Sequence, residues 1–167
     1  MNKADVENEF DKYLRRYQKI SLFLIYPALV SFFGLCLSLI TNGFTYSLCF
    51  ASNYILAYHL SLNPIGEGVT ISNIIILGVG VITLGLFVYL GLMAAKAKRH
   101  FMIAGVILYF ADFVYTIILG FDGIYGKMEL VNYIISLAMH VAFLGIYSYM
   151  IVLYVKLLRV NVERMSK

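Results

Sequence analysis

Residues 70–95 read TISNIIILGVGVITLGLFVYLGLMAA, a stretch dominated by apolar residues that contains no charged side chain. A helix of about 20 such residues, at 1.5 Å per residue, crosses a hydrocarbon core of roughly 30 Å. Three further runs of this kind occur in the chain. Together they predict four transmembrane helices, over residues 20–40, 70–95, 101–121 and 130–155.

Composition also indicates a membrane protein. Hydrophobic residues make up 62% of the 167 positions and charged residues 13%, whereas soluble domains have about 45–50% apolar and about 25% charged residues. Four spans and their loops account for the chain, so no separate soluble domain is expected. We therefore predict an all-α fold in one membrane domain, residues 1–167, built as a four-transmembrane-helix bundle in the lipid bilayer.

Basic residues set the expected orientation. Twelve of the 13 lysines and arginines gather in three clusters beside the ends of the apolar runs: Lys3, Lys12, Arg15, Arg16, Lys19, Lys96, Lys98, Arg99, Lys156, Arg159, Arg164 and Lys167. Only Lys127 lies in a loop on the other side. Because basic loops stay in the cytoplasm, we expect a multi-pass protein of the cell membrane with both termini cytoplasmic. The same explanation accounts for the net charge of +4, so nucleic acid binding is not expected.

Residues 1–19 have an amphipathic pattern. The pattern extends to residue 20, and six apolar side chains recur in it at helical spacing on one side: Val6, Phe10, Tyr13, Leu14, Tyr17 and Ile20. We predict an amphipathic cytoplasmic helix, which either lies on the membrane surface or leads as a solvated helix into the first span. Residues 156–167 are expected to form a cytoplasmic tail.

Residues 41–68 allow more than one interpretation. Apolar residues repeat at helical spacing between Leu48 and Leu62, but polar residues such as Ser52 and Asn53 interrupt the apolar surface. A fifth crossing here would turn the basic loop at residues 96–99 outward, against the charge bias. We therefore predict an external segment that contains an interfacial helix.

Glycines in the second span suggest where helices approach each other. Gly78 and Gly85 are seven positions apart and share a helix face. Small residues let backbones come close, which holds helices together in lipid, where no hydrophobic drive acts between them. The partner of this face is either another helix of the bundle or a further subunit, in a homo-oligomer or with other membrane proteins.

Asp112 and His140 are the candidate functional pair. Each lies nine or ten positions from the outer end of its span, which places both about 15 Å deep, near the bilayer midplane. A charged Asp at that depth costs about 2.5–3.5 kcal/mol on insertion scales, so we expect it to pair with the histidine. Hydroxyl groups on the same helix faces predict a polar seam around the pair: Tyr109, Thr116, Tyr133, Ser136 and Tyr147. This seam either joins two helices or serves as a proton or substrate site.

The stretch from Lys96 to Met150 has a basic loop, Tyr109-x-x-Asp112 in one span and His140 in the next. In these features it resembles small bacterial multi-span membrane proteins of unassigned function, which carry Tyr-x-x-Asp and a later His in paired helices. The resemblance covers about a third of the chain. It implies paired helices for the two residues and no particular activity.

No metal site or cofactor is expected. His59, His100 and His140 share no spacing suited to metal ligands, and a bis-histidine haem site would need a second histidine at mid-membrane depth. Cys36 and Cys49 either form a disulfide on the outer face or stay as thiols.

These observations rank three function classes. A non-enzymatic module, acting as a subunit, assembly factor or regulator, is the leading hypothesis, because no catalytic residues can be assigned. A small proton-coupled carrier that uses Asp112 and His140 is the first alternative. An enzyme embedded in the membrane that acts on a lipid is the second.

Overall fold

The computed structural model describes residues 3–41, 50, 51, 53, 55, 70–121 and 130–166, and this part of the chain contains helices and no strands. Four helical stretches are long and apolar enough to cross a membrane: Ala4–Leu37, Ile71–Ala95, Arg99–Leu119 and Tyr133–Met165. The prediction of an all-α protein with four such helices is therefore confirmed.

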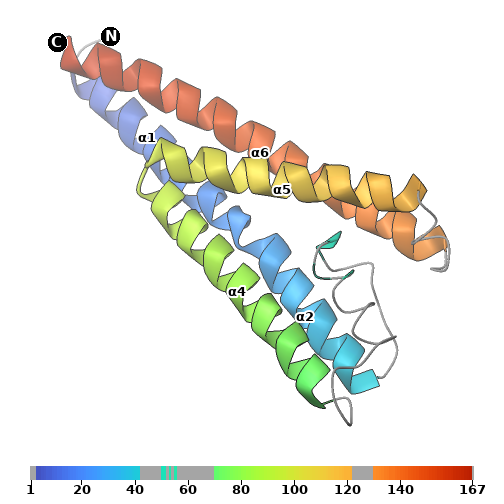
Figure 1. Cartoon of the computed structure of the whole chain (residues 1–167). Coiled ribbons are helices and arrows are strands. Elements are labelled where there is room, and N and C mark those ends of the chain that lie inside the picture. Colours follow the sequence, from blue (N-terminus) through green and yellow to red (C-terminus); the bar gives the residue numbers. More distant parts are fainter. Residues whose placement is uncertain are drawn as a thin grey trace.

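The bounds of the helices follow the apolar runs, with one large difference. The elements are α1 (Lys3–Ser21), the short 3₁₀ helix η1 (Leu22–Leu24), α2 (Tyr26–Thr41), α4 (Thr70–Ala95), α5 (Arg99–Phe121) and α6 (Leu130–Met165), as Figure 1 shows. The last helix continues well beyond residue 155, where the span was expected to end. Neither Gly nor Pro occurs in 156–165 to stop it, so most of the expected tail is helical.

The first apolar run is interrupted by Pro27. Proline has no N–H, so the carbonyl of Phe23 cannot accept the usual helical bond from four residues further on. The chain forms η1 at this point, and the Ile25 N–H donates to Leu22 O at 3.0 Å. The Tyr147 hydroxyl of α6 donates to Phe23 O at 3.5 Å. A neighbouring helix thus supplies a donor for the carbonyl at the break, as non-helical backbone at membrane depth requires.

The apolar face of α1 packs on the C-terminal part of α6. Val6 and Tyr17 are buried, and the ring of Tyr17 lies 5.4 Å from that of Tyr154. The Arg164 guanidinium lies over the Phe10 ring at 4.8 Å. Since α6 covers this face, α1 does not offer it to a membrane surface. Of the two alternatives, the helix that leads into the first span is the one that fits.

The helices form two pairs that diverge from a common end. Figure 1 shows α2 beside α4 and α5 beside α6, with both chain termini at the end where α1 lies against α6. Where the pairs converge, a buried cluster joins α1, η1, α4, α5, α6 and the first turn of α2. It includes Tyr17, Leu24, Phe87, Tyr109 and Tyr147.

The structure describes four residues between 41 and 68, and three of them lie among the helices. Phe50, Ala51 and Asn53 are buried, and we call them the inserted segment. They lie between the α2–α4 and α5–α6 pairs (Figure 1). These three residues are therefore covered by protein, and the expected interfacial position of residues 41–68 stays a prediction. The rest of the predicted interfacial helix lies outside the described residues, apart from Ile55, which has helical backbone.

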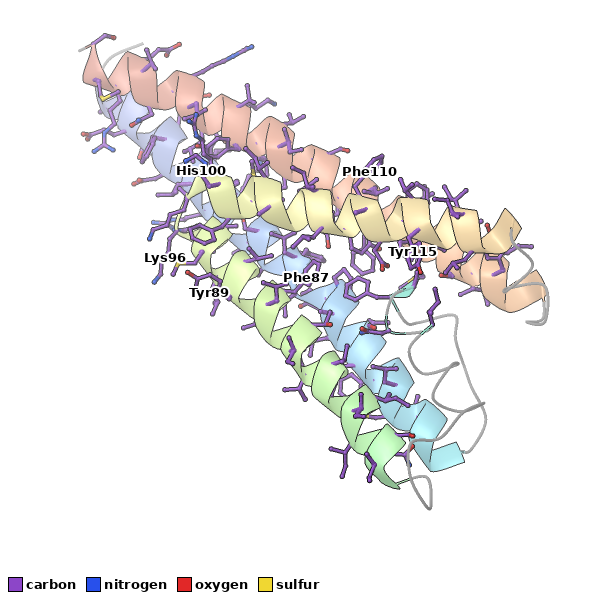
Figure 2. All side chains as sticks on the ribbon, viewed as in Figure 1. Phe87, Tyr89, Lys96, His100, Phe110 and Tyr115 are labelled. Carbon is purple, nitrogen blue, oxygen red and sulfur yellow. The ribbon has the colours of Figure 1, made fainter. Side chains whose placement is uncertain are left out.

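The two predicted glycines have no close neighbour among the described atoms. A Cβ at Gly78 or Gly85 would meet no other described atom within 4 Å, so a role of this face in helix packing stays a prediction. The two glycines share the outer side of α4 with Tyr89, whereas Phe87 points between the helix pairs (Figure 2). The sequence leaves the partner of this face open because a helix in lipid is apolar on all sides, and spacing does not tell which side faces protein.

Different glycines make the close contacts on the inner sides of the helices. A Cβ at Gly80 would lie 2.9 Å from Leu35 Cδ1, and one at Gly91 would lie 2.8 Å from Ile25 Cγ1. On α5, a Cβ at Gly105 would lie 3.1 Å from Leu24 Cδ2. The absence of a side chain at these positions lets α4 and α5 approach the first span.

Candidate functional site

The site centres on Asp112 of α5 and His140 of α6. His140 Nε2 lies 3.2 Å from Asp112 Oδ2, and the two side chains are 6% and 11% exposed. The structure therefore brings together the two ionisable residues that the sequence placed at equal depth. We call this pair the clasp.

Hydrogen bonding fixes one proton of the histidine. His140 Nδ1 lies 2.8 Å from the carbonyl oxygen of Ser136. Because a carbonyl only accepts, Nδ1 must carry hydrogen. The Nε2–Oδ2 contact then requires one further proton, which resides on the imidazole or on the carboxyl group. The clasp is thus either an ion pair or a neutral pair, with one shared proton in both cases.

Aromatic rings cover the histidine. Tyr109 and Phe113, one turn apart on α5, stack on the imidazole with centroids at 5.2 Å and 5.8 Å. The Tyr109 ring also contacts Tyr147 edge-on at 5.1 Å and Phe50 of the inserted segment at 5.9 Å. These contacts hold the imidazole in one orientation within an apolar environment.

The inserted segment binds directly to the clasp. The Ala51 N–H donates to Asp112 Oδ2 at 3.2 Å, so this oxygen contacts both His140 and the segment. The Phe50 N–H donates to Ser31 Oγ of α2 at 2.9 Å. Buried backbone amides need such acceptors, because an unpaired buried N–H is costly.

Asn53 extends the polar contacts to a third helix. Its Nδ2 donates to Ser31 Oγ at 3.2 Å, and its Oδ1 accepts from Thr83 Oγ1 of α4 at 3.4 Å. The segment therefore has side-chain partners on α2, α4 and α5. Ser31 and Thr83 were not singled out from the sequence, because a lone hydroxyl in an apolar run can bond to its own helix and gives no signal.

The predicted seam is only partly assembled around the clasp. Thr116 donates back to the carbonyl of Asp112 at 2.9 Å, one turn earlier. Tyr147 reaches Phe23 rather than the clasp. The buried hydroxyl of Ser136 has no hydrogen-bond partner among the described residues, while its carbonyl serves His140. Tyr133 lies on α6 two turns before His140 and is half-buried.

Metal and thiol chemistry have little support from the described residues. Within them no group of three His, Cys, Asp or Glu side chains is arranged to hold a metal ion. Cys36 has intermediate exposure and forms no disulfide with a described residue. Cys49 lies outside the described residues, so neither of the two alternatives for the cysteines is decided.

Comparison with known proteins identifies no relative. No family model matches the chain, and neither a curated protein nor a solved structure matches it. The resemblance noted for residues 96–150 stays a prediction, and the function has to be argued from the site.

Proposed function

We propose that this chain is a non-enzymatic membrane module with four spans and both termini on the cytoplasmic side of the cell membrane. The charge clusters support this orientation, and the termini lie at the same end of the molecule (Figure 1), as an even number of crossings requires. In this proposal the clasp is structural. It holds the inserted segment between the α2–α4 and α5–α6 pairs.

One observation carries the structural role of the clasp. Asp112 Oδ2 accepts from the Ala51 N–H and also contacts His140 Nε2. An exposed amide at membrane depth and an unpaired carboxyl are each costly, and here each offsets the cost of the other. Ser31 does the same for the Phe50 amide. These buried polar groups thus accept hydrogen bonds from backbone N–H groups, which fits a structural role.

A module of this kind acts by packing against other membrane components, as a subunit, assembly factor or regulator. On the outer side of α4, a Cβ at Gly78 or Gly85 would have no neighbour within 4 Å among the described atoms, so these positions are available for such packing. Further copies of the chain and other membrane subunits are both suitable partners for this face.

Two substitutions of Asp112 test the structural role. In Asp112→Asn the atom that replaces Oδ2 can either accept from the Ala51 N–H or donate to His140 Nε2, but not both. We therefore expect a folded protein that is less stable than the wild type by about 1–3 kcal/mol. Asp112→Leu removes both bonds and leaves the partners buried, with an expected loss of about 3–5 kcal/mol. Unfolding in mixed detergent micelles, followed by circular dichroism, measures both. Wild-type stability of Asp112→Leu would refute the proposal.

The shared proton favours a second candidate, a small proton-coupled carrier. In that case Asp112→Asn would fold but lose function, because an amide cannot exchange the proton. The assay is proton uptake into liposomes that contain the purified protein and a pH-sensitive dye. Uptake by wild type that is absent in Asp112→Asn would support the carrier, and equal signals from both would exclude a role of the carboxyl group in transport.

A further inference from the structure

A groove opens between α5 and α6 on the side of the clasp that leads to the chain termini. Its volume is about 380 Å³, and its walls include Val106, Ile107 and Phe110 of α5 with Leu144, Ser148 and Ile151 of α6. Figure 2 shows Phe110 on α5 where the two helices pass each other. The Ser148 hydroxyl donates to Leu144 O at 2.9 Å, so its polarity is satisfied within α6 and the groove presents an apolar wall.

The groove runs from the bilayer midplane towards one membrane surface. Phe110 is two positions from Asp112, while Ile151 lies 11 positions beyond His140, which is about 16 Å along the helix axis. A lipid acyl chain has the same direction and extends over the same depth within one leaflet. In the proposed orientation this is the cytoplasmic leaflet.

Two arginines lie above the groove at the membrane surface. Arg99 precedes Val106 by seven positions and Arg159 follows Ser148 by 11, so each lies on the groove side of its own helix, about two and three turns further on. Both side chains are exposed, and neither forms an ion pair with an acidic side chain among the described residues.

Packing of the turn before α5 brings the two arginines to the same region. This turn reverses the chain tightly, with Ala97 at a φ of 58°. Ala97 and Leu158 line a common cavity of about 180 Å³ together with residues of α1. Arg99 lies two positions after Ala97, and Arg159 directly follows Leu158. Positive charge is therefore concentrated at the headgroup end of an apolar groove.

We propose that this groove binds a phospholipid with an anionic headgroup, whose acyl chain lies along Phe110 and Ile151 and whose phosphate lies between Arg99 and Arg159. Guanidinium groups bind phosphate oxygens through paired hydrogen bonds. In phosphatidylcholine the positive charge of choline offsets the negative charge of the phosphate, so its attraction to the two arginines is weaker. The proposal rests on the proposed function only for the membrane placement of α5 and α6, and it does not depend on the role of the clasp.

The test compares two lipids on the purified full chain in detergent. Native mass spectrometry measures the apparent Kd of dioleoyl phosphatidylglycerol and of dioleoyl phosphatidylcholine. For the wild type we expect phosphatidylglycerol to bind about tenfold tighter or more. In the double variant Arg99→Ala/Arg159→Ala the two Kd values should become equal. In Ser148→Phe, which fills the groove, both lipids should bind more weakly.

The matched control removes two other basic residues from the same loop region. Lys96→Ala/Lys98→Ala changes the net charge by the same amount, and it should leave the lipid preference intact. An equal loss of preference in this control would refute the site in favour of diffuse attraction. Equal binding of both lipids by the wild type, or unchanged binding by Ser148→Phe, would also refute it. A dimer that Ser148→Phe dissociates would show that a second copy fills the groove instead. The stability of Asp112→Leu reports separately on the clasp.

Discussion

Substitution of Gly91 by alanine is the most direct test of how α4 packs. The new Cβ would lie 2.8 Å from Ile25 Cγ1 and 3.3 Å from Ile25 Cδ1, with the carbonyl oxygen of Ser21 at 3.5 Å. The shorter distance is below van der Waals contact, and overpacking of this kind costs about 1–3 kcal/mol. At Gly85 the same Cβ would have no neighbour within 4 Å, so Gly85→Ala is the matched control.

Comparison of the two variants isolates the packing cost. Alanine is favoured over glycine in a helix by about 0.5–1 kcal/mol, and this gain is common to both positions. The difference in unfolding free energy between Gly85→Ala and Gly91→Ala should therefore equal the overpacking cost, about 1–3 kcal/mol or about 5–150-fold in the unfolding constant. Gly80→Ala should fall between them, because its 2.9 Å contact is with the movable end of Leu35.

The assay is reversible unfolding of the purified variants by sodium dodecyl sulfate in mixed micelles, followed by far-ultraviolet circular dichroism. We expect the order of stability Gly85→Ala, then Gly80→Ala, then Gly91→Ala. A Gly85→Ala variant that is as unstable as Gly91→Ala would refute the assignment of the inner side of α4.

Three further predictions use the same assay. Ser31→Ala removes the acceptor of the Phe50 amide and of Asn53 Nδ2 and should lower the unfolding free energy by about 1–3 kcal/mol. The control is Ser148→Ala, which should be nearly neutral because the exposed Ser148 hydroxyl bonds within its own helix. Equal effects of the two variants would contradict the role of Ser31. Tyr17→Ala should lower the unfolding free energy by about 3–5 kcal/mol because Tyr17 is fully buried. Tyr26→Ala, at a position that is 49% exposed, should lower it much less. The reverse order would show that α1 does not pack on α6. Tyr147→Phe removes the donor to Phe23 O and should lower the unfolding free energy by about 0.5–1.5 kcal/mol. The loss should be smaller in a Pro27→Ala background, where the new N–H can bond to the same carbonyl. An equal loss in both backgrounds would show that Tyr147 does not compensate for the proline.

The helices that the sequence predicted correctly depend on local properties. Apolar length selects a spanning helix because each residue adds a constant rise and each apolar side chain avoids water independently of its neighbours. Hence α4 coincides with the apolar run 70–95. The pairing of Asp112 with His140 was accessible for a similar reason, since two antiparallel helices joined by a short loop bring equal depths together.

The sequence was ambiguous where one surface has two acceptable environments. The apolar face of α1 can be covered by lipid or by another helix, and its sequence pattern is the same in both cases. The polar residues around Asn53 can bond to water outside the membrane or to Ser31 and Thr83 within it. No local sequence pattern distinguishes the two environments.

Sequence alone determined that four runs are apolar enough to cross a bilayer and predicted that Asp112 meets His140, because the length of a run and the depth of a residue follow from counting positions. The tertiary structure was needed to show that Gly80 and Gly91 face protein, while Gly78 and Gly85 have no neighbour within 4 Å among the described atoms. It was also needed to show that the Ala51 amide reaches Asp112. In lipid both sides of a helix are equally apolar, so which side is buried depends on the shapes of the neighbouring helices and on the position of each polar partner.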